Sequence, residues 1–217
     1  LNNTYVWIAL LTTVWMGAIG FLDDYLKLRQ KRAGLKNEGL VERWKLAGQV
    51  TLGVALGFYL WKVPLNSLPG ASTTVPFFKN VLIVPAVVGL AWTYVPFVTF
   101  VITGTSNAVN LADGLDGLAG GIVAIAGTAL FLYSDRLFKN GFLEGSNLAP
   151  LVAVIAVGGC VGFLPYNWHP ARIMMGDAGA LFLGLLMAVT TITIGGRADY
   201  QYSGVTYFFF APLFIPF

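Results

Sequence analysis

Five aspartates stand at the ends of apolar segments, in three separate stretches of this chain. They are Asp23 with Asp24, Asp113 with Asp116, and Asp177. The chain has only 10 acidic residues, so half of its negative charge lies at these points. Carboxylate oxygens are ligands that Mg²⁺ prefers, and carboxylates beside apolar membrane segments commonly mark functional sites. If the fold brings the three stretches together, they predict a site that holds a divalent cation against a phosphorylated ligand.

The polar, glycine-rich stretch at 104–121 carries the strongest chemical signal. Asp113 and Asp116 are three residues apart and would share a face on a helical turn, as would Asn107 and Asn110. The glycines around them allow close backbone approach and expose N–H groups to phosphate oxygens. The alternative is a glycine-rich helix end with polar caps. Four polar side chains within ten residues favour a substrate site over that alternative.

The other two acidic stretches are each open to a simpler interpretation. Asp23 and Asp24 end an apolar segment, where the negative end of a helix dipole disfavours them, so a cation such as Lys27 or a metal should compensate. Asp177 opens an apolar segment, where it could be only an N-cap or could also offer a free oxygen to a metal. Arg172, five residues earlier, could pair with a phosphate.

The composition favours a membrane as the solvent of these sites. The chain is 57% hydrophobic and 11% charged, whereas soluble domains carry about 25% charged residues. Spanning segments are expected to be helices, because open strand edges cannot be satisfied in lipid. We therefore predict an all-α, multi-pass transmembrane helical bundle with about six full spans and a truncated seventh. The predicted spans are 4–22, 46–61, 81–104, 119–134, 148–164 and 178–194, with the seventh from about 206.

The basic residues orient this bundle. Seven of the 13 Lys and Arg residues lie in 23–45, which predicts that this loop is cytoplasmic. Counting crossings from there places all three acidic stretches on the cytoplasmic side. Because the basic residues are localised in this way, nucleic acid is not an expected partner. We expect residues 1–217 to form a single integral-membrane domain and to be a fragment of a longer protein, since the chain lacks an initial methionine and ends in an apolar run.

The three stretches together resemble the polyprenyl-phosphate N-acetylhexosamine-1-phosphate transferases, a family of multi-pass bacterial membrane enzymes. The resemblance rests on FLDDYLK at 21–27, NAVNLADGLDGLAGG at 107–121 and MGDAG at 175–179, and it covers nearly the whole chain. It implies a Mg²⁺-dependent transfer of a phospho-N-acetylhexosamine from a UDP-sugar donor to a polyprenyl (undecaprenyl) phosphate acceptor, with release of UMP. It also implies the bacterial inner membrane, with the active site on the cytoplasmic side. The sequence is compatible with a homodimer and does not fix the oligomeric state.

The resemblance also implies roles for individual residues. Asp177 corresponds to the Mg²⁺ ligand of the family, and Asp23 of the Asp23–Asp24 pair to a proposed base toward the lipid phosphate. The region of Asn110, Asp113 and Asp116 corresponds to positions near the metal and the nucleotide. Basic and nucleotide-facing positions complete the substrate-binding set. Its members are Asn107, Asn110, Lys27, Lys45, Arg172 and Met174, the last standing where some members have an aromatic side chain that stacks on uracil.

The donor sugar remains open between two groups of the family. The first half, with TTVPFFKN at 73–80, is most similar to members that transfer phospho-MurNAc-pentapeptide for peptidoglycan synthesis. The second half, with FLPYNWHPARIMMGDAGALFLG at 163–184, is more similar to members that transfer GlcNAc-1-phosphate from UDP-GlcNAc. A divergent member or a chimera would explain this mixture. An ion-coupled transporter is the alternative from another functional class, although the centres of the predicted spans lack charge.

Overall fold

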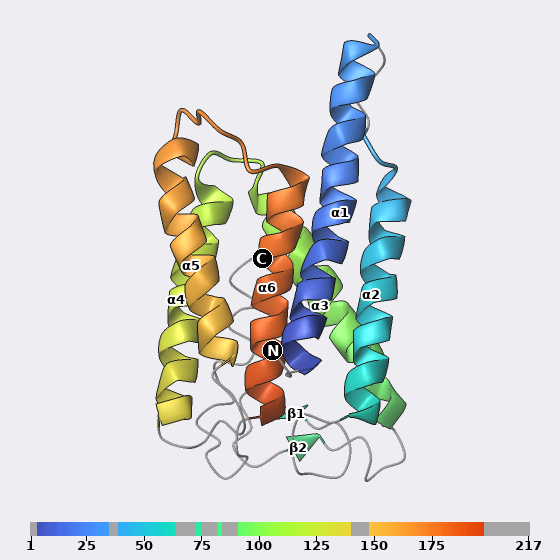
Figure 1. Cartoon of the computed structure of the whole chain (residues 1–217), viewed down its shortest axis with the longest axis vertical. Coiled ribbons are helices and arrows are strands. Elements are labelled where there is room, and N and C mark those ends of the chain that lie inside the picture. Colours follow the sequence, from blue (N-terminus) through green and yellow to red (C-terminus); the bar gives the residue numbers. More distant parts are fainter. Residues whose placement is uncertain are drawn as a thin grey trace.

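The computed structural model describes residues 4–34, 39–63, 73–74, 82–83, 91–139 and 148–197. Within this part, six α-helices run roughly side by side (Figure 1). Their bounds are α1 Thr4–Arg32, α2 Glu42–Lys62, α3 Tyr94–Ala112, α4 Leu118–Lys139, α5 Leu148–Asn167 and α6 Gly176–Arg197. A short 3₁₀ helix, η1 (Ala91–Thr93), precedes α3. The antiparallel strands β1 (Thr73–Thr74) and β2 (Leu82–Ile83) pair at the end of the bundle where α2 ends.

This architecture confirms the predicted all-α membrane bundle. Among the described residues, five helices are long and apolar enough to cross a membrane. Helix α2 is not one of the five, and its first half holds Glu42, Arg43, Lys45 and Gln49 among the apolar residues. It nevertheless lies alongside the others, packed on α3 (Figure 1). The predicted seventh span lies outside the described residues.

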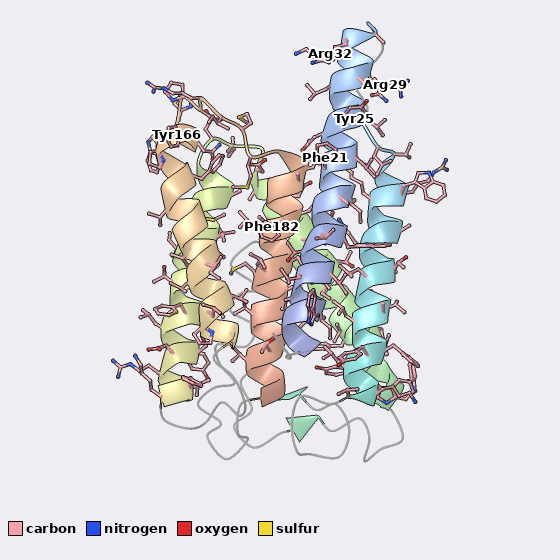
Figure 2. All side chains as sticks on the ribbon, viewed as in Figure 1. Phe21, Tyr25, Arg29, Arg32, Tyr166 and Phe182 are labelled. Carbon is pink, nitrogen blue, oxygen red and sulfur yellow. The ribbon has the colours of Figure 1, made fainter. Side chains whose placement is uncertain are left out.

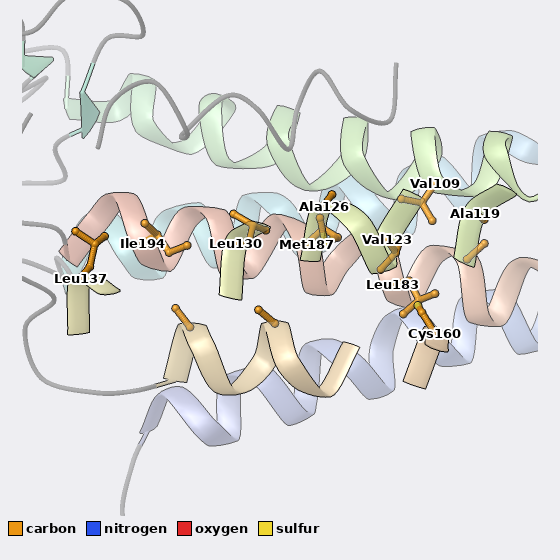
Figure 3. Packing of buried hydrophobic residues seen from close by; sticks show 13 residues of the cluster. Val109, Ala119, Val123, Ala126, Leu130, Leu137, Cys160, Leu183, Met187 and Ile194 are labelled. Atoms are coloured by element: carbon orange, nitrogen blue, oxygen red, sulfur yellow. The ribbon is translucent and has the colours of Figure 1, made fainter. Parts of the chain in front are cut away.

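Helix α6 is the centre of the bundle. One buried cluster joins it to α1, α2 and α3 through side chains such as Met16, Ile102 and Leu185. A second cluster joins it to α3, α4 and α5 through Val123, Cys160 and Met187 (Figure 3). Apolar side chains on both faces explain why α6 is the most buried of the five candidate spans. The residues at the beginning of α6 are therefore held between two groups of helices.

The helix bounds differ from the predicted spans most at α1 and α3. Helix α1 continues eight residues beyond Asp24 to Arg32, so its last turns, with Arg29, extend past the other helices (Figure 2). The expectation that Asp23 and Asp24 meet the negative end of a helix dipole is therefore wrong. The third predicted span began at residue 81, whereas α3 begins at Tyr94 and includes 105–112, which had been expected to be loop.

The alternating direction of the helices brings the predicted site regions to one end. Three regions lie at the end of the bundle opposite β1 and β2 (Figure 1). They are the C-terminal third of α1, the α3–α4 turn and the start of α6. The prediction that the three acidic stretches emerge at the same end of the bundle is thus confirmed. The C-terminal turns of α1 and the first turn of α2, which together hold six of the 13 basic residues, are at the same end.

Candidate active site

Three of the five predicted aspartates form one compact cluster. Asp23 and Asp24 come from α1 and Asp177 from the first turn of α6, and one carboxylate oxygen of each lies within 4.8 Å of the others. Asp23 is fully buried, and its Oδ1 accepts a hydrogen bond from the Leu40 N–H at 2.7 Å. Gly39 precedes Leu40 with a φ of 65°, and a Cβ there would lie 2.7 Å from Asp23 Oδ1. A glycine is therefore needed for the α1–α2 connection to cover this carboxylate.

Two lysines lie among the three carboxylates. Lys27 Nζ is 2.5 Å from Asp23 Oδ2 and 3.2 Å from Asp177 Oδ1. Lys45 Nζ, from the first turns of α2, is 2.7 Å from Asp177 Oδ2 and 3.5 Å from Asp23 Oδ2. Three carboxylates against two ammonium groups leave one net negative charge. In a partly buried site this excess favours binding of a further cation.

The start of α6 is held by carboxylates from other helices. Asp24 Oδ2 accepts from the Ala178 N–H at 3.2 Å, and the Asp113 carboxylate accepts from the Gly176 N–H. These bonds satisfy N–H groups that a helix leaves free in its first turn. Gly176 has a φ of 71°, and a Cβ there would lie 2.8 Å from Asp24 Oδ2. The sequence suggested that Asp177 could cap its own helix, whereas the observed partners of these N–H groups come from α1 and the α3–α4 turn.

Asp113 borders the cluster from the α3–α4 turn. Burial raises the pKa of its carboxyl to about 6, the Gly176 N–H opposes that rise, and the charges of Asp177 and Asp24 add to it. Asn110, on the last turn of α3, hydrogen-bonds the Asp177 side chain. Both residues therefore lie where the sequence predicted, beside the acidic cluster.

Asp116 faces a different part of the molecule. Its Oδ2 accepts from the Ala171 N–H at 3.0 Å and lies 3.0 Å from His169 Nδ1. These two contacts hold the pKa of its carboxyl below the ordinary value. The expectation that Asp113 and Asp116 share a helical face is wrong, because α3 ends at Ala112 and the chain turns before α4 begins. The two carboxylates diverge, one toward α6 and the other toward the α5–α6 connection.

The remaining predicted substrate residues are more dispersed. Asn107 pairs with Gln49 of α2 rather than with the acidic cluster. Arg172 has an exposed side chain on the α5–α6 connection. Met174 is 57% exposed and borders an apolar cavity of about 320 Å³ between α5 and α6. Its other lining residues are Gly159, Cys160, Phe163, Met175, Gly179, Phe182 and Leu183.

Sequence reasoning missed two side chains that organise this end of the bundle. Gln49 is 1% exposed within a predicted span, and a buried polar residue in such a segment was an available signal. Asn167 is also 1% exposed. Its Oδ1 accepts from the Gly117 N–H at 3.0 Å, and its Nδ2 donates to the Ile173 carbonyl at 3.0 Å. No sequence pattern predicted that Asn167 would join the α3–α4 turn to the α5–α6 connection.

The acidic cluster fits a hard divalent cation such as Mg²⁺. Its ligand atoms would be carboxylate oxygens. Among the described residues, no donor lies in hydrogen-bonding geometry to the buried Asp23 Oδ2, although Lys27 and Lys45 lie close to it. Metal–oxygen distances of about 2.1 Å place neighbouring ligands of an octahedron about 3 Å apart and opposite ligands about 4.2 Å apart. The three carboxylate oxygens lie within 4.8 Å of one another, so the side chains would draw together around such an ion.

The fold and the site together define a multi-pass membrane protein with a carboxylate and lysine centre at one end of the bundle. The model of glycosyl transferase family 4 matches residues 6–195. The chain belongs to glycosyl transferase family 4.

Several relatives of this chain carry the same name. A phospho-N-acetylmuramoyl-pentapeptide-transferase from Gemmatimonas aurantiaca is 52% identical over 216 residues, which cover 96% of this chain and 57% of the relative. Enzymes of that name from Chlorobium phaeobacteroides and Chlorobium chlorochromatii are 44% and 45% identical, over 89% of this chain and 52% of each relative. The chain thus spans about half the length of these relatives.

Proposed function

We propose that this protein transfers phospho-N-acetylmuramoyl-pentapeptide from its UDP-linked donor to a polyprenyl phosphate in the bacterial cell membrane, releasing UMP. The observation that carries the proposal is the meeting of Asp23, Asp24 and Asp177 with Lys27 and Lys45 at one end of an apolar bundle. The names of the relatives support the choice of donor, and an alignment that covers 96% of the chain spans both of its halves. Transfer of GlcNAc-1-phosphate is the second candidate, favoured by the motifs at 163–184.

Mg²⁺ is the proposed cofactor, with Asp23, Asp24 and Asp177 as the residues that would hold it. When bound, it would neutralise charge on the diphosphate and on the leaving UMP. This proposal adds Asp23 and Asp24 to the metal ligands. The sequence alone had assigned that role to Asp177 and had assigned Asp23 and Asp24 to catalysis.

Lys27 and Lys45 would reduce the electrostatic repulsion between the two substrates of this reaction. Both substrates are anions, and two unit charges 4 Å apart repel by about 4 kcal/mol at an effective dielectric constant of 20. The two ammonium groups lie at the carboxylate cluster, where they can exchange carboxylate partners for phosphate oxygens. Arg172 is exposed on the neighbouring connection and could add to this positive field.

We favour direct attack of the lipid phosphate on the β-phosphorus of the donor. In this step the new bond forms from a lipid phosphate oxygen to phosphorus, and the bond from phosphorus to the UMP oxygen breaks. A phosphate monoester has a second pKa of about 6, so it is largely ionised at pH 7, and positioning matters more than strong base catalysis. Asp23 remains the candidate base by family resemblance. An aspartyl-phosphate intermediate is the alternative.

The apolar bundle has a role in presenting the lipid acceptor. Moving a prenyl chain out of the bilayer costs about 0.8 kcal/mol for each CH₂, so the polar site must meet the lipid phosphate at the membrane surface. Seven basic residues in 23–45 support a cytoplasmic position for the acidic end. A homodimer remains compatible with this arrangement.

Purified full-length protein in detergent, given Mg²⁺ and undecaprenyl phosphate, provides the test. UDP-MurNAc-pentapeptide and UDP-GlcNAc would be supplied separately, and UMP and the lipid product would be measured by chromatography and mass spectrometry. We expect product only with the pentapeptide donor. Product only with UDP-GlcNAc would replace the first candidate by the second, and UMP formation with neither donor would overturn both.

A further inference from the structure

Helices α2 and α3 lie against each other in opposite directions, and small residues set their separation. A Cβ on Gly53 would lie 2.7 Å from Thr99 Cα, and one on Gly57 would lie 2.9 Å from Val95 Cα. The two glycines thus mark close backbone contact between α2 and α3. This contact lies in the half of their interface that is remote from the acidic cluster. Contacts of this kind are non-directional, so they fix how closely the helices approach better than how far one slides along the other.

A directional contact occurs between the same two helices, one turn of α2 closer to the acidic cluster than Gly53. Gln49 follows the four-residue spacing of the two glycines and is 1% exposed. Asn107 Nδ2 donates to Gln49 Oε1 at 2.5 Å, and Gln49 Nε2 donates to Asn107 Oδ1 at 3.4 Å. Asn107 Nδ2 also donates to the Thr103 carbonyl at 2.8 Å. The pairing of two amides at two points fixes their relative orientation, which one hydrogen bond would not.

Each partner of this amide pair lies one helical turn from a residue that contacts Asp177. Lys45 precedes Gln49 by four residues, and its Nζ is 2.7 Å from Asp177 Oδ2. Asn110 follows Asn107 by three residues and hydrogen-bonds the Asp177 side chain. Sliding α2 by one turn along α3 would displace Lys45 by about 5.4 Å. The register of α2 on α3 therefore decides whether Lys45 and Asn110 both reach the carboxylate of Asp177.

We propose that Gln49 is a positioning residue, whose two-point contact with Asn107 fixes the register of α2 on α3 and so places Lys45 and Asn110 at Asp177. Single buried polar residues are known to set helix register in other helical assemblies. The positioning role of Gln49 concerns how α2 packs on α3. It rests on the proposed function only where transferase activity is measured.

The first test uses Gln49→Leu, which keeps a branched apolar side chain in the buried position, one atom shorter than Gln, and removes the amide. Spin labels at the exposed positions 54 and 100, in a cysteine-free full-length background, report the separation of α2 and α3 without metal or substrate. We expect Gln49→Leu to shift or broaden that separation, to weaken binding of Mn²⁺ by about 10- to 100-fold and to lower kcat/KM by a similar factor. Thr51→Val is the matched control, because in the described part of the chain the Thr51 hydroxyl donates to the Ala47 carbonyl of its own helix, and its loss should change none of the three.

A complementary exchange keeps the test decisive if Gln49→Leu does not fold. Gln49→Asn and Asn107→Gln each alter the reach of one amide, whereas the double variant restores the combined length of the pair. We expect each single variant to disturb the spin-label separation and Mn²⁺ affinity, and the double variant to recover both.

A folded Gln49→Leu protein with wild-type separation and Mn²⁺ affinity would overturn the proposal. So would a double variant no better than its parents. Failure of the wild type to transfer either sugar would instead overturn the proposed function, and the spin-label result would still decide the role of Gln49.

Discussion

Gly20 gives the sharpest prediction, because it lies where α1 meets the beginning of α6. A Cβ at this position would lie 2.3 Å from Ala178 Cα and 2.5 Å from Ala178 N. Ordinary van der Waals contact begins at 3.4 Å, so Gly20→Ala requires the two backbones to separate by about 1 Å. These atoms belong to backbone, which cannot rotate away as a flexible side chain could.

That displacement acts directly on the acidic cluster. The bond from the Ala178 N–H to Asp24 Oδ2 is already 3.2 Å long, and lengthening it by about 1 Å breaks it. Asp23 and Asp24 would move away from Asp177 with α1. Misplacement of this size lowers catalytic efficiency by about 100-fold, and forced overpacking costs about 1–3 kcal/mol of stability. We therefore expect Gly20→Ala to reduce UMP release by about 100-fold in protein that still folds.

Gly17→Ala is the matched control on the same helix. A Cβ at Gly17 would meet no described residue within 4 Å, so this variant should keep its activity and gain slightly in helix stability. UMP release and thermal unfolding of the wild type and both variants, purified in the same detergent, give the comparison. Wild-type turnover in Gly20→Ala would refute the idea that close α1–α6 contact sets the geometry of the site.

Further predictions concern the charges and the order of the reaction. Asp177→Asn should abolish nearly all UMP release in folded protein, because it removes one of the two carboxylates that both lysines contact. Asp116→Asn should do the same, because it weakens the contacts of that side chain with Ala171 and His169; full activity in either variant would contradict that residue's assignment. The carboxyl of Asp113 should titrate near pH 6 in carbon-13 NMR spectra, and Asp177→Asn should lower this midpoint, because it removes one of the negative charges that favour the protonated form; an unchanged or raised midpoint would contradict this. Under single-turnover conditions no UMP should appear before lipid phosphate is added, and early release would instead support the aspartyl intermediate.

The sequence predicted the topology and the main cluster because both follow from strong signals. Long apolar runs determine how often the chain crosses, and the parity of those crossings sends Asp23, Asp113 and Asp177 to one end. The positive charge of Lys27 made it a reasonable partner for Asp23 and Asp24, and the resemblance to the family implied that Lys45 faces the substrates. The structure places both lysines at the cluster.

The details that the sequence did not predict depend on side-chain direction and on local turns. Apolarity falls after residue 22, but α1 continues because the following residues, such as Leu26 and Gln30, are good helix formers. The spacing of Asp113 and Asp116 suggested one helical face, and only the turn that ends with Gly117 at a φ of 76° separates them. The pairing of Gln49 with Asn107 joins residues 58 positions apart, which no local periodicity can reveal.

The proposed reaction requires Asp23, Asp24 and Asp177 to hold one divalent cation. Anomalous X-ray diffraction from crystals of the full-length protein soaked in Mn²⁺ would locate that ion. We expect an anomalous peak about 2 Å from carboxylate oxygens of these three residues, and its loss in Asp177→Asn crystals. A peak bound elsewhere, or no peak at Mn²⁺ concentrations that support full activity, would show that these three residues do not hold the cation.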